Sequence, residues 1–109
     1  MLLALALPGR AEAAGAPCPG RHARTLSFST GSVYVFKRNG SVCAVTYAKW
    51  PGVQRRMTVS VQARGHRPVR REVRSPLSAG PVTVRAGQRC VWVRGSVGSG
   101  SVSSGWILC

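Results

Sequence analysis

The amino-acid sequence predicts an all-β protein: a small disulfide-stapled antiparallel β-sandwich or barrel of about six to eight short strands. Most of the chain consists of short alternating or β-branched runs separated by Gly, Pro and Asn, and no stretch sustains the apolar period of a helix. An Asn-Gly pair joins two of these runs as in a β-hairpin. Four cysteines in 109 residues provide candidate staples for a domain with a small core.

The N-terminal segment, residues 1–13, is expected to be a secretion signal. An apolar run at residues 2–7 is followed by an Ala-Glu-Ala sequence that matches the A-x-A pattern of a cleavage site. No Lys or Arg precedes the run, which leaves open a start upstream of Met1, and a buried N-terminal strand or helix is the alternative. Cleavage gives a single β domain over residues 14–109. No later stretch approaches the roughly 20 apolar residues of a membrane span, so a secreted, extracellular or cell-surface protein without a transmembrane segment is expected.

The strongest secondary-structure signal is a β-hairpin formed by residues 32–38 and 41–47. Both runs are rich in valine and aromatic residues, which favour strands. Asn39 and Gly40 lie between them and accept the positive φ angles of a type I′ turn, whose twist matches the flanking strands.

Weaker signals place the other elements of the first half. Residues 25–29 alternate and predict an edge strand, and the Trp-Pro-Gly sequence at residues 50–52 predicts a turn after the hairpin. Residues 57–63 alternate cleanly, as a half-buried antiparallel strand requires. One face of this strand carries Met57, Val59 and Val61, and the other carries Thr58, Ser60 and Gln62.

The second half is predicted to contain another hairpin and a final strand. Residues 64–74 are ambiguous between an exposed loop and a weak edge strand. Residues 81–85 and 89–94 are expected to pair around a tight Ala-Gly-Gln turn. The Gly/Ser-rich segment 95–104 could be a linker, but an apolar terminus follows it and would then be exposed. A final strand pinned by Cys109 is therefore favoured.

The cysteines are Cys18, Cys43, Cys90 and Cys109, and an even number beside a secretion signal indicates disulfides. Four cysteines allow three pairings, among which the sequence alone does not choose. Cys18 with Cys43 and Cys90 with Cys109 is favoured, because each bridge would tie a terminal segment to a hairpin strand. A loop of about 20 residues corresponds to roughly 3 kcal/mol of stabilisation per bridge. The absence of a C-x-x-C pair argues against a zinc or redox site, and no metal or cofactor is expected.

The charge of the chain is strongly one-sided. Lys and Arg number 16 against 2 for Asp and Glu, a formal net charge of +14. Such an excess attracts anionic polymers, among them wall teichoic acids, acidic polysaccharides, anionic lipid and, non-specifically, nucleic acid. The alternative is that genome composition has enriched arginine on a solvated surface. The expected partner is an anionic polymer of the cell envelope.

An arginine cluster is the first candidate binding site. Its members are Arg64, Arg67, Arg70, Arg71 and Arg74, whose spacing near three suits an irregular loop or a helix face better than a strand. Guanidinium groups bind phosphate or carboxylate oxygens bidentately. A merely solvated charged surface is the alternative, and the two interpretations carry equal weight.

Trp50 is the candidate contact aromatic, because it lies on a turn and is expected to be exposed. Most of the other aromatic residues lie in apolar-flanked strands, where core packing is their expected use. They are Tyr34, Phe36, Tyr47, Trp92 and Trp106.

Catalytic chemistry has little support in the sequence. The chain has no Asp, and Glu72 is the only side-chain carboxylate left after signal cleavage, which argues against paired-carboxylate hydrolysis and carboxylate-ligated metal catalysis. The best enzyme hypothesis is a ribonuclease-type acid/base pair of His66 and Glu72. The favoured alternative is a solvated His66 and a Glu72 paired with a neighbouring arginine, so the protein is not expected to be an enzyme.

The most distinctive motif is the Ala-Gly-Pro-Val-Thr-Val segment at residues 79–84, followed by Gly-Gln-Arg-Cys-Val-Trp at residues 87–92. Other shared segments are 31–35, 42–46, 57–61 and 95–98, so the set covers most of the mature chain. Their order resembles the small secreted proteins of filamentous actinobacteria typified by spore-associated protein A. The resemblance implies an exported, disulfide-bonded protein found with spores or aerial growth, without a defined catalytic activity or functional residues to carry over. This chain differs in lacking an additional central cysteine pair and in its arginine-rich centre.

The predicted function is that of a secreted, non-enzymatic protein of the cell or spore surface, which binds anionic envelope polymers through a basic face. The first alternative is a secreted protein-binding module such as a protease inhibitor, since rigid disulfide-bonded β scaffolds lower the entropic cost of binding. The second alternative is the small ribonuclease-like enzyme.

Overall fold

The computed structural model describes residues 18–109, so the predicted secretion signal and its cleavage site lie outside the described residues. The strands are β1 (Arg21–Phe28), β2 (Gly31–Arg38), β3 (Ser41–Ala48), β4 (Arg55–Ala63), β5 (Val69–Ser75), β6 (Ser78–Arg85), β7 (Val91–Val97) and β8 (Gly100–Ile107). This part of the chain contains no helix, and therefore none with the length and hydropathy to cross a membrane. The prediction of an all-β protein is confirmed.

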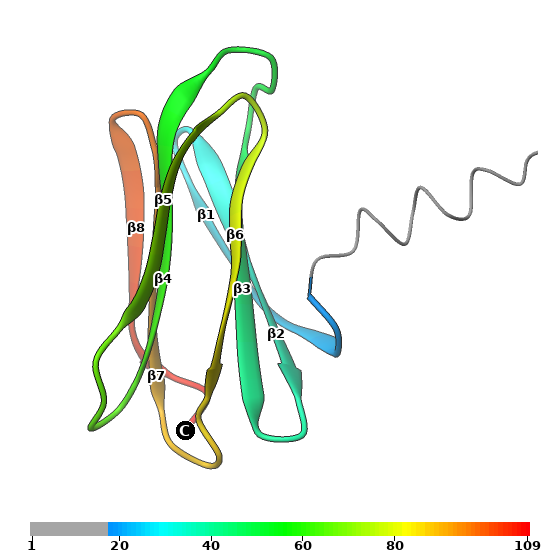
Figure 1. Ribbon diagram of the computed structural model, residues 1–109, viewed down its shortest axis with the longest axis vertical. Coiled ribbons are helices and arrows are strands. Elements are labelled where there is room, and N and C mark those ends of the chain that lie inside the picture. Colours follow the sequence, from blue (N-terminus) through cyan, green and yellow to red (C-terminus); the bar gives the residue numbers. More distant parts are fainter. Residues whose placement is uncertain (1–17) are drawn as a thin grey trace, which may run out of the picture.

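The eight strands form two antiparallel four-stranded sheets that lie face to face (Figure 1). One sheet has the order β1-β2-β3-β6 and the other has the order β5-β4-β7-β8. Across the gap, β4 packs against β6 and β3, and β1 approaches β8. Each sheet keeps its own edges, so of the two predicted alternatives the fold is the sandwich.

The core between the sheets is built mainly from valine. Alternation along β4 turns Met57, Val59 and Val61 inward, as the sequence predicts, and all three are fully buried. They meet the inward valines of other strands, namely Val33, Val35, Val42, Val91, Val93 and Val97. Because β-branched side chains pack well on a pleated surface, this composition suits two facing sheets.

The predicted β2–β3 hairpin is confirmed. The two strands pair in continuous register over their whole length. φ is 48° at Asn39 and 83° at Gly40, so both turn residues have the positive φ that a type I′ turn requires. The turn lies at the lower end of the sandwich in Figure 1.

The second predicted hairpin is wrong, although both of its strands exist. β6 pairs with β3, whereas β7 pairs with β4 and β8, so the two predicted partners lie in different sheets. Their connection crosses from one sheet to the other. The amides of Ala86 and Gly87 both donate to the carbonyl oxygen of Gly40, at 2.9 Å each, which fixes this crossing against the β2–β3 turn. Local alternation cannot distinguish such a crossing from a tight hairpin turn.

The expectation that most strand aromatics pack in the core is wrong for Tyr34, Trp92 and Trp106, whereas Phe36 and Tyr47 pack against a second, small buried cluster formed by Cys18, Cys43 and Val45. Tyr34, Phe36 and Tyr47 lie on the outer face of the β1-β2-β3-β6 sheet, and Tyr34 and Tyr47 meet there edge to face. Trp92 and Trp106 lie on the outer face of the other sheet. The physical reason is alternation: the neighbouring valines occupy the inward positions, which leaves the aromatic positions outside.

Both favoured disulfides are confirmed. Cys18–Cys43 joins the N-terminal end of the described chain to β3 with a Cα–Cα distance of 5.7 Å. Cys90–Cys109 joins the residue before β7 to the segment after β8 at 3.9 Å. The Gly/Ser-rich segment is structured, since it contains the end of β7, a turn and the first half of β8. Two disulfides are compatible with an extracellular protein.

Candidate functional site

The outer face of the β5-β4-β7-β8 sheet is the candidate functional site. Alternation on β4 turns Val59 into the core and its neighbours Thr58 and Ser60 outward. Residues directly opposite one another on adjacent strands lie on the same side of a sheet. Strand pairing therefore decides which residues share this face, and most of them are arginine, serine or threonine.

Two neighbouring rows of side chains cross this face. The register places Arg70, Ser60, Arg94 and Ser103 in one row across the four strands. The next row consists of Glu72, Thr58, Ser96 and Ser101. Arg70 and Arg94 are two strands apart, about 10 Å between backbones, so they flank Ser60. We call this outer surface the arginine face, after its outward arginines. They are Arg56, Arg70, Arg74 and Arg94.

A shallow groove of about 480 Å³ is lined by both Arg70 and Arg94 and extends beyond Arg94 onto β8. The hydroxyl-bearing residues that line it are Thr58, Ser60, Ser96, Ser101 and Ser103. Thr58 Oγ1 and Ser96 Oγ share a hydrogen bond of 2.7 Å. Because hydroxyl groups both donate and accept, the groove offers partners to phosphate oxygens and to sugar or polyol hydroxyls.

Glu72 is the only side-chain carboxylate in residues 18–109, and it lies on the arginine face. Its carboxylate oxygens are 3.1 Å from Arg56 Nε and 3.0 Å from Arg70 Nη2. All three side chains are exposed, so solvent screens both ion pairs. The single carboxylate does not neutralise the surrounding guanidinium groups, and the face remains positive.

A pair of tryptophans closes one end of the arginine face. The rings of Trp92 and Trp106 meet edge to face with their centroids 5.2 Å apart. The guanidinium of Arg94 lies 5.2 Å from the Trp92 ring, and that of Arg64 lies 5.5 Å from the Trp106 ring, both within cation–π range. Trp92 Nε1 donates to Ser103 Oγ at 2.6 Å, which holds the indole beside the groove.

The predicted arginine cluster folds as a turn and an edge strand. Residues 64–68 reverse the chain after β4, and the rest of the cluster lies on β5. This is the edge-strand alternative that the sequence leaves open. Strand alternation, and not a spacing of three, therefore decides which of its arginines share a surface.

The structure divides these five arginines between two surfaces. Arg70 and Arg74 belong to the arginine face, and Arg64 borders it through its contact with the tryptophan pair. Arg71 pairs with an inward residue of β4, so it lies on the opposite side of β5. Arg67 lines a separate shallow pocket together with residues of β6. The five side chains do not form one clamp.

Trp50 lies far from Arg64, the first residue of this cluster, and at the same end of the sandwich as Arg74, the last. It is 57% exposed, which confirms the expected exposure of this turn residue. Trp50 precedes β4, however, and Arg64 follows it. The length of that strand separates the two residues by about 30 Å at the usual rise of an extended chain.

His66 and Glu72 are not brought together either. His66 lies in the turn after β4, where Gln62 Nε2 donates to its carbonyl oxygen at 2.8 Å. Glu72 lies within β5 and binds arginines through both carboxylate oxygens. Within the part of the chain that the structure describes, no three His, Cys, Asp or Glu side chains are placed to hold a metal ion.

Arg56, Arg94 and the groove hydroxyls are not among the residues predicted for the site. The alternation of Arg94 with the valine before it is a signal that could have placed Arg94 on an outer face. No local sequence pattern indicates that β7 lies beside β4. It depends on the pairing of segments far apart in the chain, such as Thr58 with Ser96, which are separated by 38 residues.

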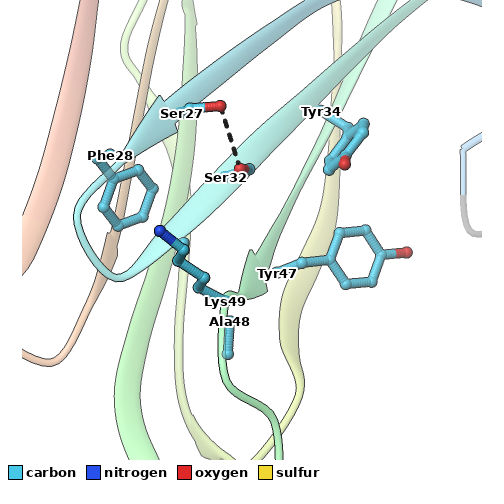
Figure 2. A pocket seen from close by; sticks show the side chains of 8 residues that line it. Ser27, Phe28, Ser32, Tyr34, Tyr47, Ala48 and Lys49 are labelled. Atoms are coloured by element: carbon cyan, nitrogen blue, oxygen red, sulfur yellow. Dashed lines mark hydrogen bonds between the residues drawn. The ribbon is translucent and has the colours of Figure 1, made fainter.

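A second pocket, of about 250 Å³, lies on the outer face of the β1-β2-β3-β6 sheet (Figure 2). Its polar lining comes from Ser27, Ser32, Tyr34, Tyr47 and Lys49. Ser27 Oγ and Ser32 Oγ are 3.4 Å apart, and the Tyr34 and Tyr47 ring centroids are 5.6 Å apart. The pocket thus combines one cationic group with several hydroxyl groups.

Comparisons with known proteins give no match to this sequence or fold. No family model matches the chain, and no curated protein or solved structure is similar to it at a significant level. The functional argument therefore depends on the chemistry of the surfaces described above.

Proposed function

We propose that this is a secreted, non-enzymatic protein of the cell or spore surface that binds anionic envelope polymers through the arginine face. The observation that carries the proposal is the row formed by Arg70, Ser60, Arg94 and Ser103, in which the two exposed arginines lie on either side of Ser60 and next to further hydroxyl groups of the groove. A formal net charge of +14 adds a long-range attraction for polyanions.

The ligand class follows from the chemistry of these groups. Guanidinium binds phosphate oxygens through two parallel hydrogen bonds, which are stronger than hydrogen bonds between neutral groups. Serine and threonine hydroxyls suit alcohol groups. A polyol-phosphate chain of the teichoic-acid type presents both kinds of group along its length, and the open groove can accept an extended chain.

The tryptophan pair extends this chemistry to sugar substituents. Trp106 is 38% exposed, and it lies with Trp92 in a row beside the row of Arg70 and Arg94. An exposed indole offers an apolar surface with a polar tip, which suits a partly apolar ring that carries hydroxyl groups. Polymers that carry sugars beside their phosphates therefore fit the face well.

Secretion and surface association are part of the same proposal. Residues 1–13 have the pattern of a secretion signal, and the two disulfides need an oxidising compartment to persist. The resemblance to small secreted actinobacterial proteins points to spores or aerial growth as the place where the protein acts.

The test is co-sedimentation of the oxidised mature protein with isolated Gram-positive cell walls, with and without teichoic acid, over a series of salt concentrations. We expect binding that requires the polyanion and weakens steeply as salt rises, because screening shortens the range of charge interactions. Binding that is equal with and without teichoic acid would contradict the proposal.

Paired variants separate the arginine face from net charge. Arg70→Gln/Arg94→Gln should weaken wall binding by about tenfold or more, since hydrogen bonds to charged groups each contribute roughly 1.5–3 kcal/mol. Arg24→Gln/Arg89→Gln removes the same charge from exposed positions outside this face and should have a much smaller effect. Equal losses in both variants would show that charge alone, and not this face, determines binding.

A further inference from the structure

Three apolar side chains project from one end of the sandwich. Trp50 and Val53 come from the β3–β4 loop and Leu77 from the β5–β6 turn, and their exposed fractions are 57%, 58% and 50%. No other large apolar side chain in residues 18–109 is as exposed. We call these three residues the apolar tip. Because exposed apolar groups are unfavourable in water, such a cluster indicates a surface that becomes covered.

Backbone hydrogen bonds hold the apolar tip together. Ala48 N donates to Leu77 O at 2.9 Å, and Gly52 N donates to Pro76 O at 3.0 Å. The β3–β4 loop and the β5–β6 turn are therefore bonded side by side, at the upper end of the sandwich in Figure 1. A surface fixed in this way loses little conformational entropy when it docks.

Cationic residues lie at the same end of the sandwich as the apolar tip. Lys49 Nζ lies 5.0 Å from the Trp50 ring centroid. Arg55 is the first residue of β4 after the loop. Arg56 and Arg74 lie opposite each other at the same end of the sheet. The apolar tip therefore has one cationic group in contact with it and further arginines at the adjoining strand ends.

The pocket of Figure 2 adjoins the apolar tip, because Lys49 lines the pocket and also contacts Trp50. Figure 2 shows the Lys49 side chain extending back along the strands toward Phe28 and Ser32. An ammonium group that shares a pocket with the hydroxyls of Ser27 and Ser32 is a suitable partner for phosphate oxygens. The volume of the pocket, about 250 Å³, suits a single lipid headgroup.

We propose that the apolar tip inserts into the interface of an anionic phospholipid bilayer and that the adjoining pocket accepts a headgroup phosphate. Tryptophan is favoured at the boundary between acyl chains and headgroups, where Trp50 would lie with Val53 and Leu77. Lys49 and Arg55 would then lie at the level of the anionic headgroups. This membrane docking is independent of polymer binding, since the groove lies on a sheet face and the tip at a loop end.

Charge and hydrophobicity together favour an anionic bilayer as the surface that the apolar tip binds. Binding of a hydrated polymer would leave the apolar tip in water. The charged residues at this end of the strands, among them Lys49 and Arg55, are cationic, which favours an anionic surface as the partner. An anionic bilayer satisfies both features, because it offers an apolar layer and negative charge at adjacent depths.

Trp50 can report its own insertion. The variant Trp92→Phe/Trp106→Phe leaves Trp50 as the remaining tryptophan. With phosphatidylglycerol vesicles its fluorescence should shift to shorter wavelength and be quenched by brominated acyl chains, and with pure phosphatidylcholine vesicles it should not change. If these substitutions impair folding, co-sedimentation of the unsubstituted protein with the same two vesicle types compares its binding to anionic and to neutral bilayers.

Two exposed valines provide a matched pair of variants. Val53 belongs to the apolar tip. Val69 is 44% exposed and is the first residue of β5, whose last residue lies at the end of the sandwich that carries the tip. Val53→Ser should weaken binding to phosphatidylglycerol vesicles severalfold, and Val69→Ser should leave it unchanged. Trp50→Ala should weaken it by about tenfold, as expected for the loss of one buried large side chain.

The outcomes separate this inference from the proposed polymer binding. Arg70→Gln/Arg94→Gln should lose wall binding yet keep the blue shift of Trp50 on anionic vesicles. Equal vesicle binding by Val53→Ser and Val69→Ser would overturn the membrane proposal. An unchanged Trp50 spectrum on phosphatidylglycerol vesicles would overturn it as well.

Discussion

Thr46 on β3 donates its hydroxyl hydrogen to the carbonyl oxygen of Thr58 on β4, at 2.9 Å, across the gap between the two sheets. Thr46 is fully buried among valines and is one of two buried polar residues in the described part of the chain. Thr58 lines the groove of the arginine face through its own side chain. The same hydrogen bond therefore joins the sheets and anchors the strand that carries the groove.

Thr46→Val should lower the free energy of unfolding by about 1–2 kcal/mol, because valine keeps the shape of threonine but loses a buried hydrogen bond. Urea denaturation followed by circular dichroism measures the change. The control is Thr83→Val on the exposed side of β6, which should stay within about 0.5 kcal/mol of the unsubstituted protein. Equal effects of the two variants would show that the inter-sheet hydrogen bond contributes nothing.

Gly95 on β7 lies at a close contact between the two sheets. A Cβ atom added there would clash with Val33 Cγ2 and lie 2.6 Å from Thr46 Oγ1. Gly95→Ala should therefore lower the free energy of unfolding by about 1–3 kcal/mol through overpacking. Because Val33→Ala removes one of the clashing methyl groups, the double variant should lose less stability than the sum of the single variants. Additive losses in urea denaturation would contradict this packing argument.

The parts of the fold that depend on local pattern are predictable from the sequence. The β2–β3 hairpin follows from its Asn-Gly turn, and the buried face of β4 follows from the alternation of residues 57–63. The partner of β6 is not predictable in this way. Residues 81–85 and 89–94 have the pattern of a hairpin, yet the chain between them crosses to the other sheet. Long-range pairing, which the local pattern does not encode, decides that choice.

The candidate site shows the same limit. An arginine-rich segment is visible in the sequence, but its spacing suggests a single cluster where strand alternation separates Arg70 from Arg71. Arg94 joins the site only because β7 pairs with β4. Tyr34 and Trp92 are misplaced for a related reason: alternation alone does not say which of two apolar faces turns inward. In β2 and β7 the valine face does so.

Removal of the Cys90–Cys109 bridge should lower the free energy of unfolding by about 3 kcal/mol. The bridge closes a loop with a sequence separation of 19 and pins the end of β8 beside the start of β7. The variant Cys90→Ser/Cys109→Ser tests this by urea denaturation. Cys18→Ser/Cys43→Ser, with a separation of 25, should cost a similar amount. A loss below about 1 kcal/mol in either variant would contradict the chain-entropy argument for that bridge.

Glu72→Gln should strengthen binding to teichoic-acid-containing walls while changing stability by less than about 1 kcal/mol. Glu72 is the carboxylate that binds Arg56 and Arg70, so its neutralisation releases two guanidinium groups for the polymer. The small effect on stability follows because all three side chains are exposed and solvent screens their pairing. Gln88→Lys raises the net charge equally from an exposed turn position outside the arginine face and should strengthen binding less. Weaker wall binding by Glu72→Gln in the co-sedimentation assay would show instead that Glu72 orients Arg70 for the ligand.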